Sequence, residues 1–281
     1  MRIVALGVLS VALVAASSVA AEPEEIAVSV RGSGAIRVPV RIDGQGPFVF
    51  LLDTGASHTT ITSDLVDRLR LSVVARARVT TAAGIQERPI ARLEHMAIGS
   101  ASREGLLPSV VSRADLRSME PGIDGVVGQD FLAAFDYTLD YRRKRLRWSA
   151  AGDDDRVRAR LPLVQAGGRS LVQVTAEQRE VLMVPDSGTN EFVIFERDGR
   201  TAVEVDEAVQ AFAVSTLVAR EFGRGGQLRD LRVGELTLRG RPAVVIAATG
   251  PRDVVGDGLL PLHHFSSVSF SNSGSYMLVR N

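Results

Sequence analysis

Residues 50–57 read Phe50-Leu51-Leu52-Asp53-Thr54-Gly55-Ala56-Ser57, and residues 183–190 read Met183-Val184-Pro185-Asp186-Ser187-Gly188-Thr189-Asn190. In both segments an apolar, strand-like run ends in a triplet of Asp, a hydroxyl residue and Gly. The glycine lets the backbone turn tightly with amide hydrogens aimed at the carboxylate, and the hydroxyl can bond across to the other turn. Two carboxylates presented by equivalent turns can share one proton and activate a water molecule between them.

The similarity between the two halves extends beyond these triplets. Residues 122–132 match residues 250–260, and the match aligns two glycines that lie 75 residues after Asp53 and 70 residues after Asp186. Both halves therefore keep nearly the same register over most of their length. This repeated order predicts that two related units make up the chain.

The residue pattern predicts an all-β chain. Val, Thr and Ile recur in short runs broken by Gly, Pro and Asp, and helical periodicity is scarce. Hairpins are expected late in each half, over Tyr137–Trp148 and over Val268–Val279. The predicted organisation is a signal peptide at 1–21, an N-terminal β lobe at 22–148, a linker at 149–160 and a C-terminal β lobe at 161–281. The linker is small and charged, and its adjacent aspartates lack the alternating spacing of a calcium loop.

The first residues predict export. Arg2 precedes an apolar stretch from Ile3 to Ala16, followed by small residues up to Ala21, which is typical of a cleavable secretory signal. An uncleaved membrane anchor is the alternative, but the apolar run is shorter than the ~20 residues that span a bilayer. We therefore expect a periplasmic or secreted protein that has no membrane contact after signal cleavage.

Composition excludes several classes of function. The chain has no cysteine, so thiol catalysis, cysteine-ligated zinc and disulfides are excluded. The formal net charge is +0, which favours neither nucleic acid nor an anionic membrane as a partner. No serine-nucleophile elbow, Walker loop or dinucleotide fingerprint occurs. The hydrophobic content of 45% is adequate for a packed core.

The four histidines do not predict a metal site. None has a partner at zinc-ligand spacing, and the side chains of His263 and His264 are expected to diverge. His58, close after Asp53, either tunes the pKa of that aspartate or faces water on a loop. We therefore expect neither a metal nor an organic cofactor.

These motifs resemble a known family. The segment Asp53–Ser57 combined with Val126–Leu132, repeated as Asp186–Thr189 with Val254–Gly256, resembles the retropepsin-like aspartic proteases, with a bacterial pattern in the first half. The arrangement of both copies in one chain is similar to that of pepsin. The resemblance implies a double-lobed aspartic protease fold with an active-site cleft between two pseudo-repeated β lobes. It also implies that the two apolar-apolar-Gly elements pack beneath the active-site loops.

The resemblance assigns Asp53 and Asp186 as the catalytic dyad. The residues expected to support the dyad are Thr54, Gly55, Ser187, Gly188 and Thr189. A hairpin from Arg78 to Ile90 is expected to close over the site, and its flap candidates are Ala83, Gly84 and Ile85. The tyrosine that pepsin carries in its flap has no counterpart here. A hairpin over Phe212–Leu231 in the second half, with glycines near its turn, is interpreted as an ordinary surface hairpin.

Two features make the turns unequal. Pro185 lacks an amide hydrogen and restricts the residue before it, so the second turn is expected to be offset from the first. Thr189 can donate to its carboxylate whereas Ala56 cannot. On that basis Asp186 is predicted to be the more acidic partner and Asp53 the proton holder.

The predicted function is an aspartic endopeptidase, a hydrolase that carries out proteolysis without cofactors. The expected substrate is a peptide or unfolded protein bound in an extended conformation, and the expected state is a monomer because one chain supplies both turns. The alternative is a catalytically weak or inactive peptide-binding or partner-binding module on the same fold.

Overall fold

A computed structural model describes residues 24–32, 34–81, 84–150, 152, 154–176, 178–215, 220–248 and 256–281. The predicted signal peptide at 1–21 lies outside these residues. Within the described ranges, no helix combines the length and apolar character that crossing a bilayer requires.

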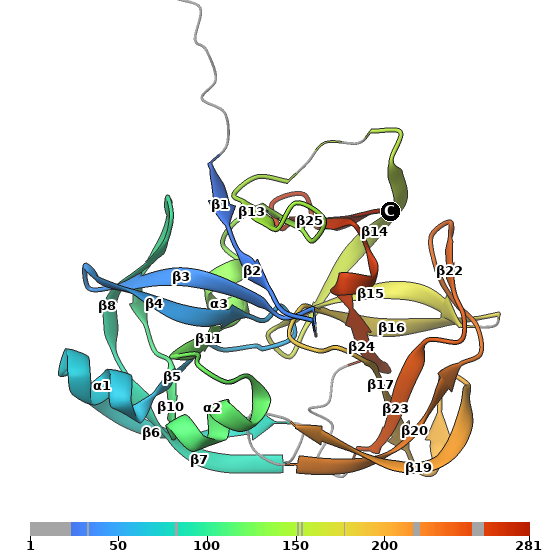
Figure 1. The fold of residues 1–281 in the computed structure, drawn as a ribbon, viewed down its shortest axis with the longest axis horizontal. Helices are drawn as coiled ribbons and strands as arrows, with labels where there is room; N and C mark the ends of the chain where they lie inside the picture. The colour runs from blue at the N-terminus through green and yellow to red at the C-terminus, as the bar shows by residue number, and fades with distance from the viewer. Residues whose placement is uncertain are drawn as a thin grey trace, which may run out of the picture.

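The first lobe is one curled sheet with three short helices (Figure 1). Its strands are β2 (Ser29–Val30), β3 (Ile36–Ile42), β4 (Gln45–Leu52), β5 (Thr60–Thr62), β6 (Val73–Thr81), β7 (Gly84–Ala91), β8 (Leu93–Ile98), β9 (Ala101–Leu106), β10 (Ser109–Val111) and β11 (Gly125–Val127). Its helices are α1 (Ser63–Leu69), α2 (Arg113–Met119) and α3 (Gln129–Leu132). The strand order is β6-β7-β10-β5-β11-β4-β3-β8-β9, with β2 paired to β3.

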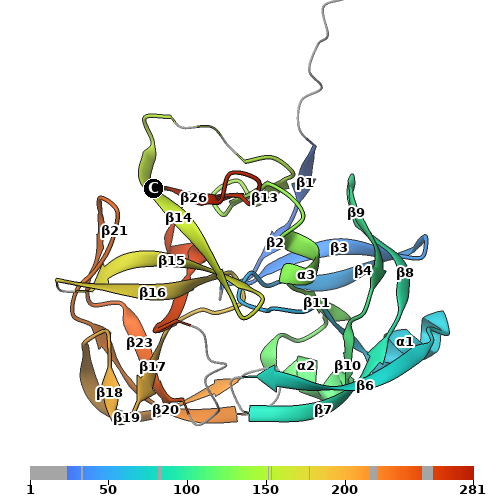
Figure 2. The same cartoon turned by 180° about the vertical axis from the view of Figure 1, so that it is seen from behind.

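The second lobe lies beside the first in both views (Figures 1 and 2). Its elements are β15 (Arg169–Ala176), β16 (Arg179–Asp186), β17 (Phe192–Arg197), β18 (Arg200–Thr201), β19 (Val205–Ser215), β20 (Arg220–Leu228), β21 (Leu231–Val233), β22 (Leu236–Leu238), β23 (Pro242–Ala247), β24 (Gly258–Pro261) and the 3₁₀ helix η1 (Leu262–His264). The path β15-β16-β24-β17-β23-β20-β19 corresponds strand for strand to the path β3-β4-β11-β5-β10-β7-β6 of the first lobe.

An antiparallel sheet joins the lobes, and we call it the interlobe sheet. Its strands run in the order β1 (Glu25–Ala27), β13 (Arg145–Arg147), β12 (Tyr137–Asp140), β25 (Ser267–Ser271), β26 (Tyr276–Arg280) and β14 (Val157–Ala166). The two late hairpins predicted from the sequence are present as β12–β13 and β25–β26. They meet where Tyr137 pairs with Phe270. The protein is therefore all-β, as the sequence predicted.

Alternating burial explains why these residues form strands. In β3 the side chains of Val38 and Val40 are buried while Pro39 and Arg41 between them are exposed. The period of two places one face of each strand in the core and the other in solvent. Strand β14 begins at Val157, inside the range 149–160 that the sequence assigned to the linker, because its first residues pair with β26.

The structure corrects the predicted repeat. In the first lobe β11 runs parallel to β4, with Val127 beside Leu52. In the second lobe the strand in the same place is β24, with Leu260 beside Pro185. The element beneath the second turn is thus Gly258–Pro261, whereas the sequence match implied Val254–Gly256, of which Val254 and Val255 lie outside the described residues.

Two aspartates fix this corrected register. A carboxylate oxygen of Asp124 accepts from the amide of Val49, and one of Asp257 accepts from the amide of Leu182, across 75 residues in both lobes. The amides of Asp124 and Asp257 donate back to the carbonyls of the same two residues. The unit that both lobes share is therefore Asp-Gly followed by two apolar residues, at 124–127 and at 257–260. It precedes the aligned glycine, Gly128, in the first lobe and follows the aligned glycine, Gly256, in the second.

Both lobes carry a long hairpin on the side opposite the interlobe sheet (Figures 1 and 2). In β6–β7 the last described pair is Thr81 with Gly84, so the flap candidate Ala83 lies outside the described residues and the side chain of Ile85 is not described. In β19–β20 the glycines predicted near the turn lie within β20 instead. Gly223 pairs with Phe212, and a Cβ there would overlap Val244 of β23, so this glycine permits close strand packing.

Candidate active site

The two Asp triplets meet between the lobes. Asp53 directly follows β4 and Asp186 ends β16, and their exposed fractions are 8% and 6%. A Cβ at Gly188 would lie 2.6 Å from Cγ of Asp53, and a Cβ at Gly55 would overlap the carboxylate of Asp186. Each glycine thus leaves room for the aspartate of the opposite turn.

Reciprocal hydrogen bonds join the turns. Oγ1 of Thr54 donates to the carbonyl of Pro185 at 2.7 Å and accepts from the amide of Ser187 at 3.0 Å. Oγ of Ser187 donates to the carbonyl of Leu52 at 2.7 Å and accepts from the amide of Thr54 at 3.1 Å. The cross-bonds expected from the two hydroxyls are therefore present, and all four are buried. They hold two segments 133 residues apart in one rigid arrangement.

Pro185 does not offset the second turn. Its carbonyl accepts the same bond from Thr54 that the carbonyl of Leu52 accepts from Ser187. The antiparallel ladder between β15 and β16 ends at the pair of Val172 with Met183, so the missing amide of Pro185 is not needed for pairing with β15. The predicted offset is wrong because the proline lies just beyond the end of that ladder.

The two carboxyl groups form a coupled pair. A side-chain hydrogen bond joins Asp53 and Asp186, and burial raises the pKa of both. For Asp186, burial and the adjacent charge of Asp53 raise the pKa well above its ordinary value. Two carboxyls this close cannot both ionise, so the pair holds a single proton.

The structure reverses the predicted direction of the asymmetry. One oxygen of Asp53 accepts from the amides of Gly55 and Ala56, at 2.9 and 3.0 Å. These bonds, the bond from Asp186 and the charge of Arg169 all oppose the effect of burial on the pKa of Asp53. The hydroxyl of Thr189 donates to the carbonyl of Glu191 and not to Asp186. Asp186 is therefore the proton holder, and Asp53 is the more acidic partner.

Arg169 is a site residue that the sequence did not reveal. Its Nε donates to the carbonyl of Gly55 at 2.7 Å, across 114 residues. It begins β15, after the tight turn at Gly167 and Gly168 that brings it against the turn of Asp53. Its positive charge lowers the pKa of Asp53.

Helix α3 supports the first turn from behind. Nε2 of Gln129 donates to the carbonyl of Thr54 at 2.7 Å. Oδ1 of Asp130 accepts from both the amide and the hydroxyl of Thr59, at 2.8 and 2.6 Å. In the sequence, these two polar residues could have been recognised as site residues only from their position directly after Gly128.

Within the described residues, no hydrogen bond or ring contact joins a histidine side chain to Asp53 or Asp186. His58 is exposed and its Nδ1 contacts Oγ of Ser57 at 2.9 Å. The rings of His263 and His264 do not diverge as predicted, because their centroids are 4.3 Å apart, with His264 also stacked on Phe192. Burial lowers the pKa of His264 to about 4. Among the described residues no group of side chains suited to a metal ion is found.

Comparison with known proteins finds a family similarity in the first half of the chain. Residues 38–131 match the family model for aspartyl proteases. A solved retropepsin-like aspartic protease from Rickettsia conorii is similar at 17% identity, over 45% of this chain and 90% of that one, with a TM-score of 0.32. No curated protein matches the chain. Residues 38–131, which hold the Asp53 turn and β11, are thus similar to the aspartyl protease family.

Proposed function

We propose that this protein is an aspartic endopeptidase, with Asp53 and Asp186 as its catalytic residues. The observation that carries the proposal is the coupled carboxyl pair held by reciprocal bonds between two equivalent turns. The family match to residues 38–131 supports the same reading for the first turn. The intact second turn at Pro185 favours the enzyme over the alternative of a weakly active or inactive binding module.

The asymmetry of the pair assigns a role to each carboxyl. Ionised Asp53 takes a proton from a water molecule whose oxygen attacks the peptide carbonyl carbon, and Asp186 gives its proton to the carbonyl oxygen. The tetrahedral intermediate then collapses as the carbon–nitrogen bond breaks. Asp53 gives its proton to the departing nitrogen, and a hydroxyl proton of the intermediate returns to Asp186. The pair is thereby restored with one proton.

The proposed substrate is an unfolded protein or peptide in extended form. Hairpins β6–β7 and β19–β20 lie on the same side of the molecule, so an extended chain could pair with a hairpin edge while its ends remain free (Figure 2). This arrangement favours cleavage within a chain over removal of terminal residues. We further propose that the protein acts as a monomer after export to a periplasm or the medium.

Inhibition by a statine-type peptide tests the proposal. The full chain is incubated with an unfolded protein between about pH 3 and 7, with and without the inhibitor. Because the statine hydroxyl mimics the tetrahedral intermediate, we expect fragments to form and the inhibitor to stop their formation at stoichiometric concentration. The matched control is the same peptide lacking the hydroxyl. Binding without cleavage would instead support the binding module.

The pH profile should respond to Arg169. Activity rises as the pH passes the pKa of Asp53 and falls as it passes that of Asp186, and burial places both limbs above the ordinary value of 3.8. Arg169→Gln removes the positive charge that lowers the pKa of Asp53. The pKa of Asp53 therefore rises, and the acid limb of kcat/KM moves to higher pH. Arg169→Lys should restore the limb, and Arg179→Gln, exposed on β16, should leave it in place. An unchanged acid limb in Arg169→Gln would contradict this role.

A further inference from the structure

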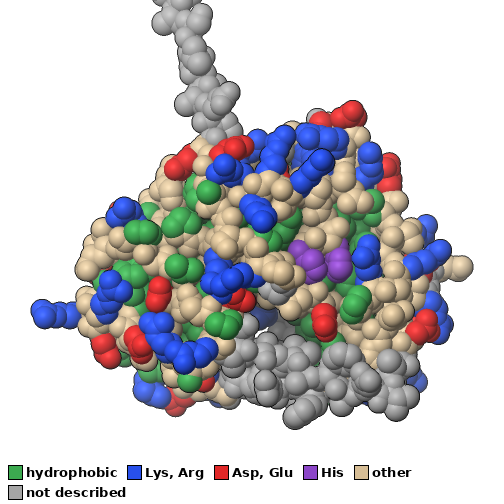
Figure 3. Space-filling view, viewed as in Figure 1, with side chains coloured by type: hydrophobic (Ala, Val, Ile, Leu, Met, Phe, Trp, Pro, Cys, Tyr) green, Lys and Arg blue, Asp and Glu red, His purple; other side chains and the backbone are tan. Residues whose placement is uncertain are grey.

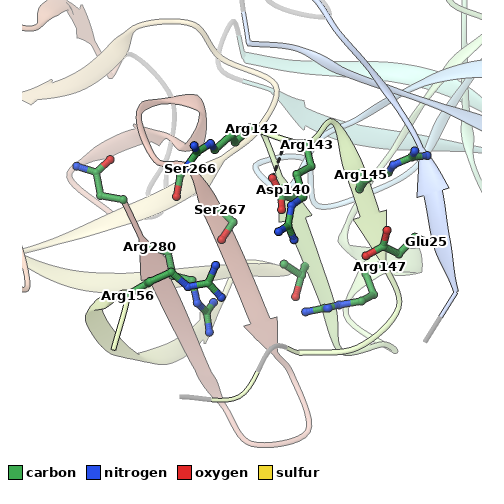
Figure 4. A pocket seen from close by; sticks show the side chains of 12 residues that line it. Glu25, Asp140, Arg142, Arg143, Arg145, Arg147, Arg156, Ser266, Ser267 and Arg280 are labelled. Atoms are coloured by element: carbon green, nitrogen blue, oxygen red, sulfur yellow. Dashed lines mark hydrogen bonds between the residues drawn. The ribbon is translucent and has the colours of Figure 1, made fainter. Parts of the chain in front are cut away.

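A second polar site lies on the outer face of the interlobe sheet. A pocket of about 340 Å³ opens there (Figure 4). Six of its lining residues are arginines: Arg142, Arg143, Arg145, Arg147, Arg156 and Arg280. In β13 the side chain of Leu146 points into the core, so its neighbours Arg145 and Arg147 point outward. The long hairpins lie at the opposite end of the molecule, so a ligand here would not compete with a substrate (Figure 1).

The positive charge of this pocket is only partly balanced. Arg156 and Arg280 share one carboxylate, that of Asp154, at 2.9 and 3.3 Å. Among the described residues the other four arginines of the pocket form no ion pair, and the lining adds only the carboxylates of Glu25 and Asp140. The charge of Asp155 also acts on Arg156. Six guanidinium groups thus face four side-chain carboxylates, those of Glu25, Asp140, Asp154 and Asp155. Figure 3 shows the same concentration of basic side chains over β13 and β25.

One guanidinium group is left with an unused donor. Nε of Arg147 is buried and has no hydrogen-bond partner within the part of the chain that the structure describes. Its cross-strand neighbour is Glu25 of β1. A buried N–H group normally finds an acceptor, and a small shift of the Arg147 side chain would bring its Nε to a ligand oxygen in the pocket.

The lining indicates which chemistry would bind. Besides the charged residues it offers hydroxyl and amide groups, from Thr138, Ser266, Ser267 and Asn281, and no aliphatic or aromatic side chain. Guanidinium forks match the oxygens of phosphate in bidentate geometry. The absence of an aromatic ring in the described lining gives a nucleobase nothing to stack on. The concave shape suits a compact group and not a flat or extended polymer.

We propose that this pocket binds a small phosphate-bearing anion with two or more negative charges. The anion would neutralise the excess of guanidinium groups and satisfy the donor of Arg147. Its source is either a soluble phosphate compound or the phosphate headgroup of an anionic lipid. The two sources share the chemistry and are separated by the arms of the experiment.

Isothermal titration of the full chain with inorganic pyrophosphate tests the soluble arm. Arg145→Gln and Arg147→Gln should each weaken binding by about tenfold or more, since each removes a charge-assisted donor. The control Arg41→Gln changes an exposed arginine of β3 outside the pocket and should bind as the wild type does. Glu25→Gln removes a repelling carboxylate and should tighten binding. Added salt should weaken binding in all variants that retain it.

Co-sedimentation with phosphatidic acid vesicles, whose phosphomonoester headgroup can carry two negative charges, tests the lipid arm against phosphatidylcholine vesicles. Vesicle binding that is lost in Arg145→Gln and kept in Arg41→Gln supports the pocket and identifies a lipid headgroup as its ligand. Equal losses in pocket and control variants would overturn the proposal, as would the absence of binding in both arms. Unchanged thermal unfolding of Arg145→Gln, whose side chain is exposed, shows that a loss of binding is not a loss of fold.

Discussion

Replacing Asp186 with Asn is expected to lower kcat by about 10²–10⁴-fold, the range that a positioned general acid contributes. The amide of Asn cannot give a proton to the oxyanion, although it keeps the shape of the carboxyl group. Asp53→Asn should lose a comparable factor because its amide cannot take a proton from water. Single-turnover assays with an unfolded protein substrate measure both losses.

The fold of Asp186→Asn should survive, which separates lost chemistry from lost structure. The pKa of Asp186 is raised in the folded state, so the native protein binds more protons than the unfolded chain. Its contribution to stability is therefore present at low pH and declines as the pH rises from the ordinary value of 3.8 toward the raised pKa. The Asn variant lacks this decline and should unfold at the same or higher temperature than the wild type at neutral pH.

A surface aspartate provides the matched control for this loss. Asp67 is exposed on α1, and Asp67→Asn should retain wild-type kcat and wild-type stability. Equal proteolysis by wild type and both dyad variants would show that another site, or a contaminant, carries the activity.

The two Asp turns and the bonds between them could be predicted because their signal is local. An apolar strand followed by Asp, a hydroxyl residue and Gly specifies the turn within a few residues. Once Asp53 and Asp186 are taken as equivalent positions of the repeat, the hydroxyls of Thr54 and Ser187 are expected to bond to the opposite turn, as they do. The hairpins β12–β13 and β25–β26 were predictable for the same reason, since alternation and turn residues lie within a short stretch.

The register of the second lobe could not be read in this way. The repeated letters Val-Val-Gly favoured residues 254–256, whereas the strand beside β16 is chosen by its return contact with Leu182. That contact depends on Asp257, whose role becomes visible only when Asp124 is seen to do the same in the first lobe. This strand pairing depends on contacts between residues far apart in the sequence. Leu259 and Leu260 take the places in β24 that two valines take in β11, so residue identity does not reveal the register.

The prediction of which aspartate holds the shared proton was wrong for a similar reason. The sequence compared Ala56 with Thr189, which are neighbours of the two aspartates along the chain. Two backbone amides oppose the effect of burial at each carboxylate. The decisive difference is charge, because Arg169 arrives from a distant hairpin and lowers the pKa of Asp53, while the charge of Asp53 raises the pKa of Asp186. Sequence proximity gave the wrong sign because the electrostatics of a buried pair are set by contacts in space.

The second large effect is expected on removing a hydroxyl that joins the turns. Thr54→Ala leaves the carbonyl of Pro185 and the amide of Ser187 without their buried partner. Each such group costs about 1–3 kcal/mol, so the free energy of unfolding should fall by about 3 kcal/mol. Urea denaturation measures this change. The kcat should fall as well, because the carboxyl pair loses its fixed separation, although Thr54 itself donates no proton to substrate.

A double-mutant cycle with Ser187→Ala distinguishes a joint clamp from two independent bonds. Once one hydroxyl is gone, the turns can separate and water can reach the remaining buried groups, so the second substitution should cost less than it does alone. We expect the double variant to be more stable than the sum of the single losses predicts, by about 1 kcal/mol or more. Thr60→Ala, which removes a buried hydroxyl bonded to Ser109 in the same lobe, should be additive with Ser187→Ala and leave kcat unchanged. Strict additivity of Thr54 and Ser187, with full activity retained, would mean that the reciprocal bonds stabilise each lobe separately and do not hold the carboxyl pair.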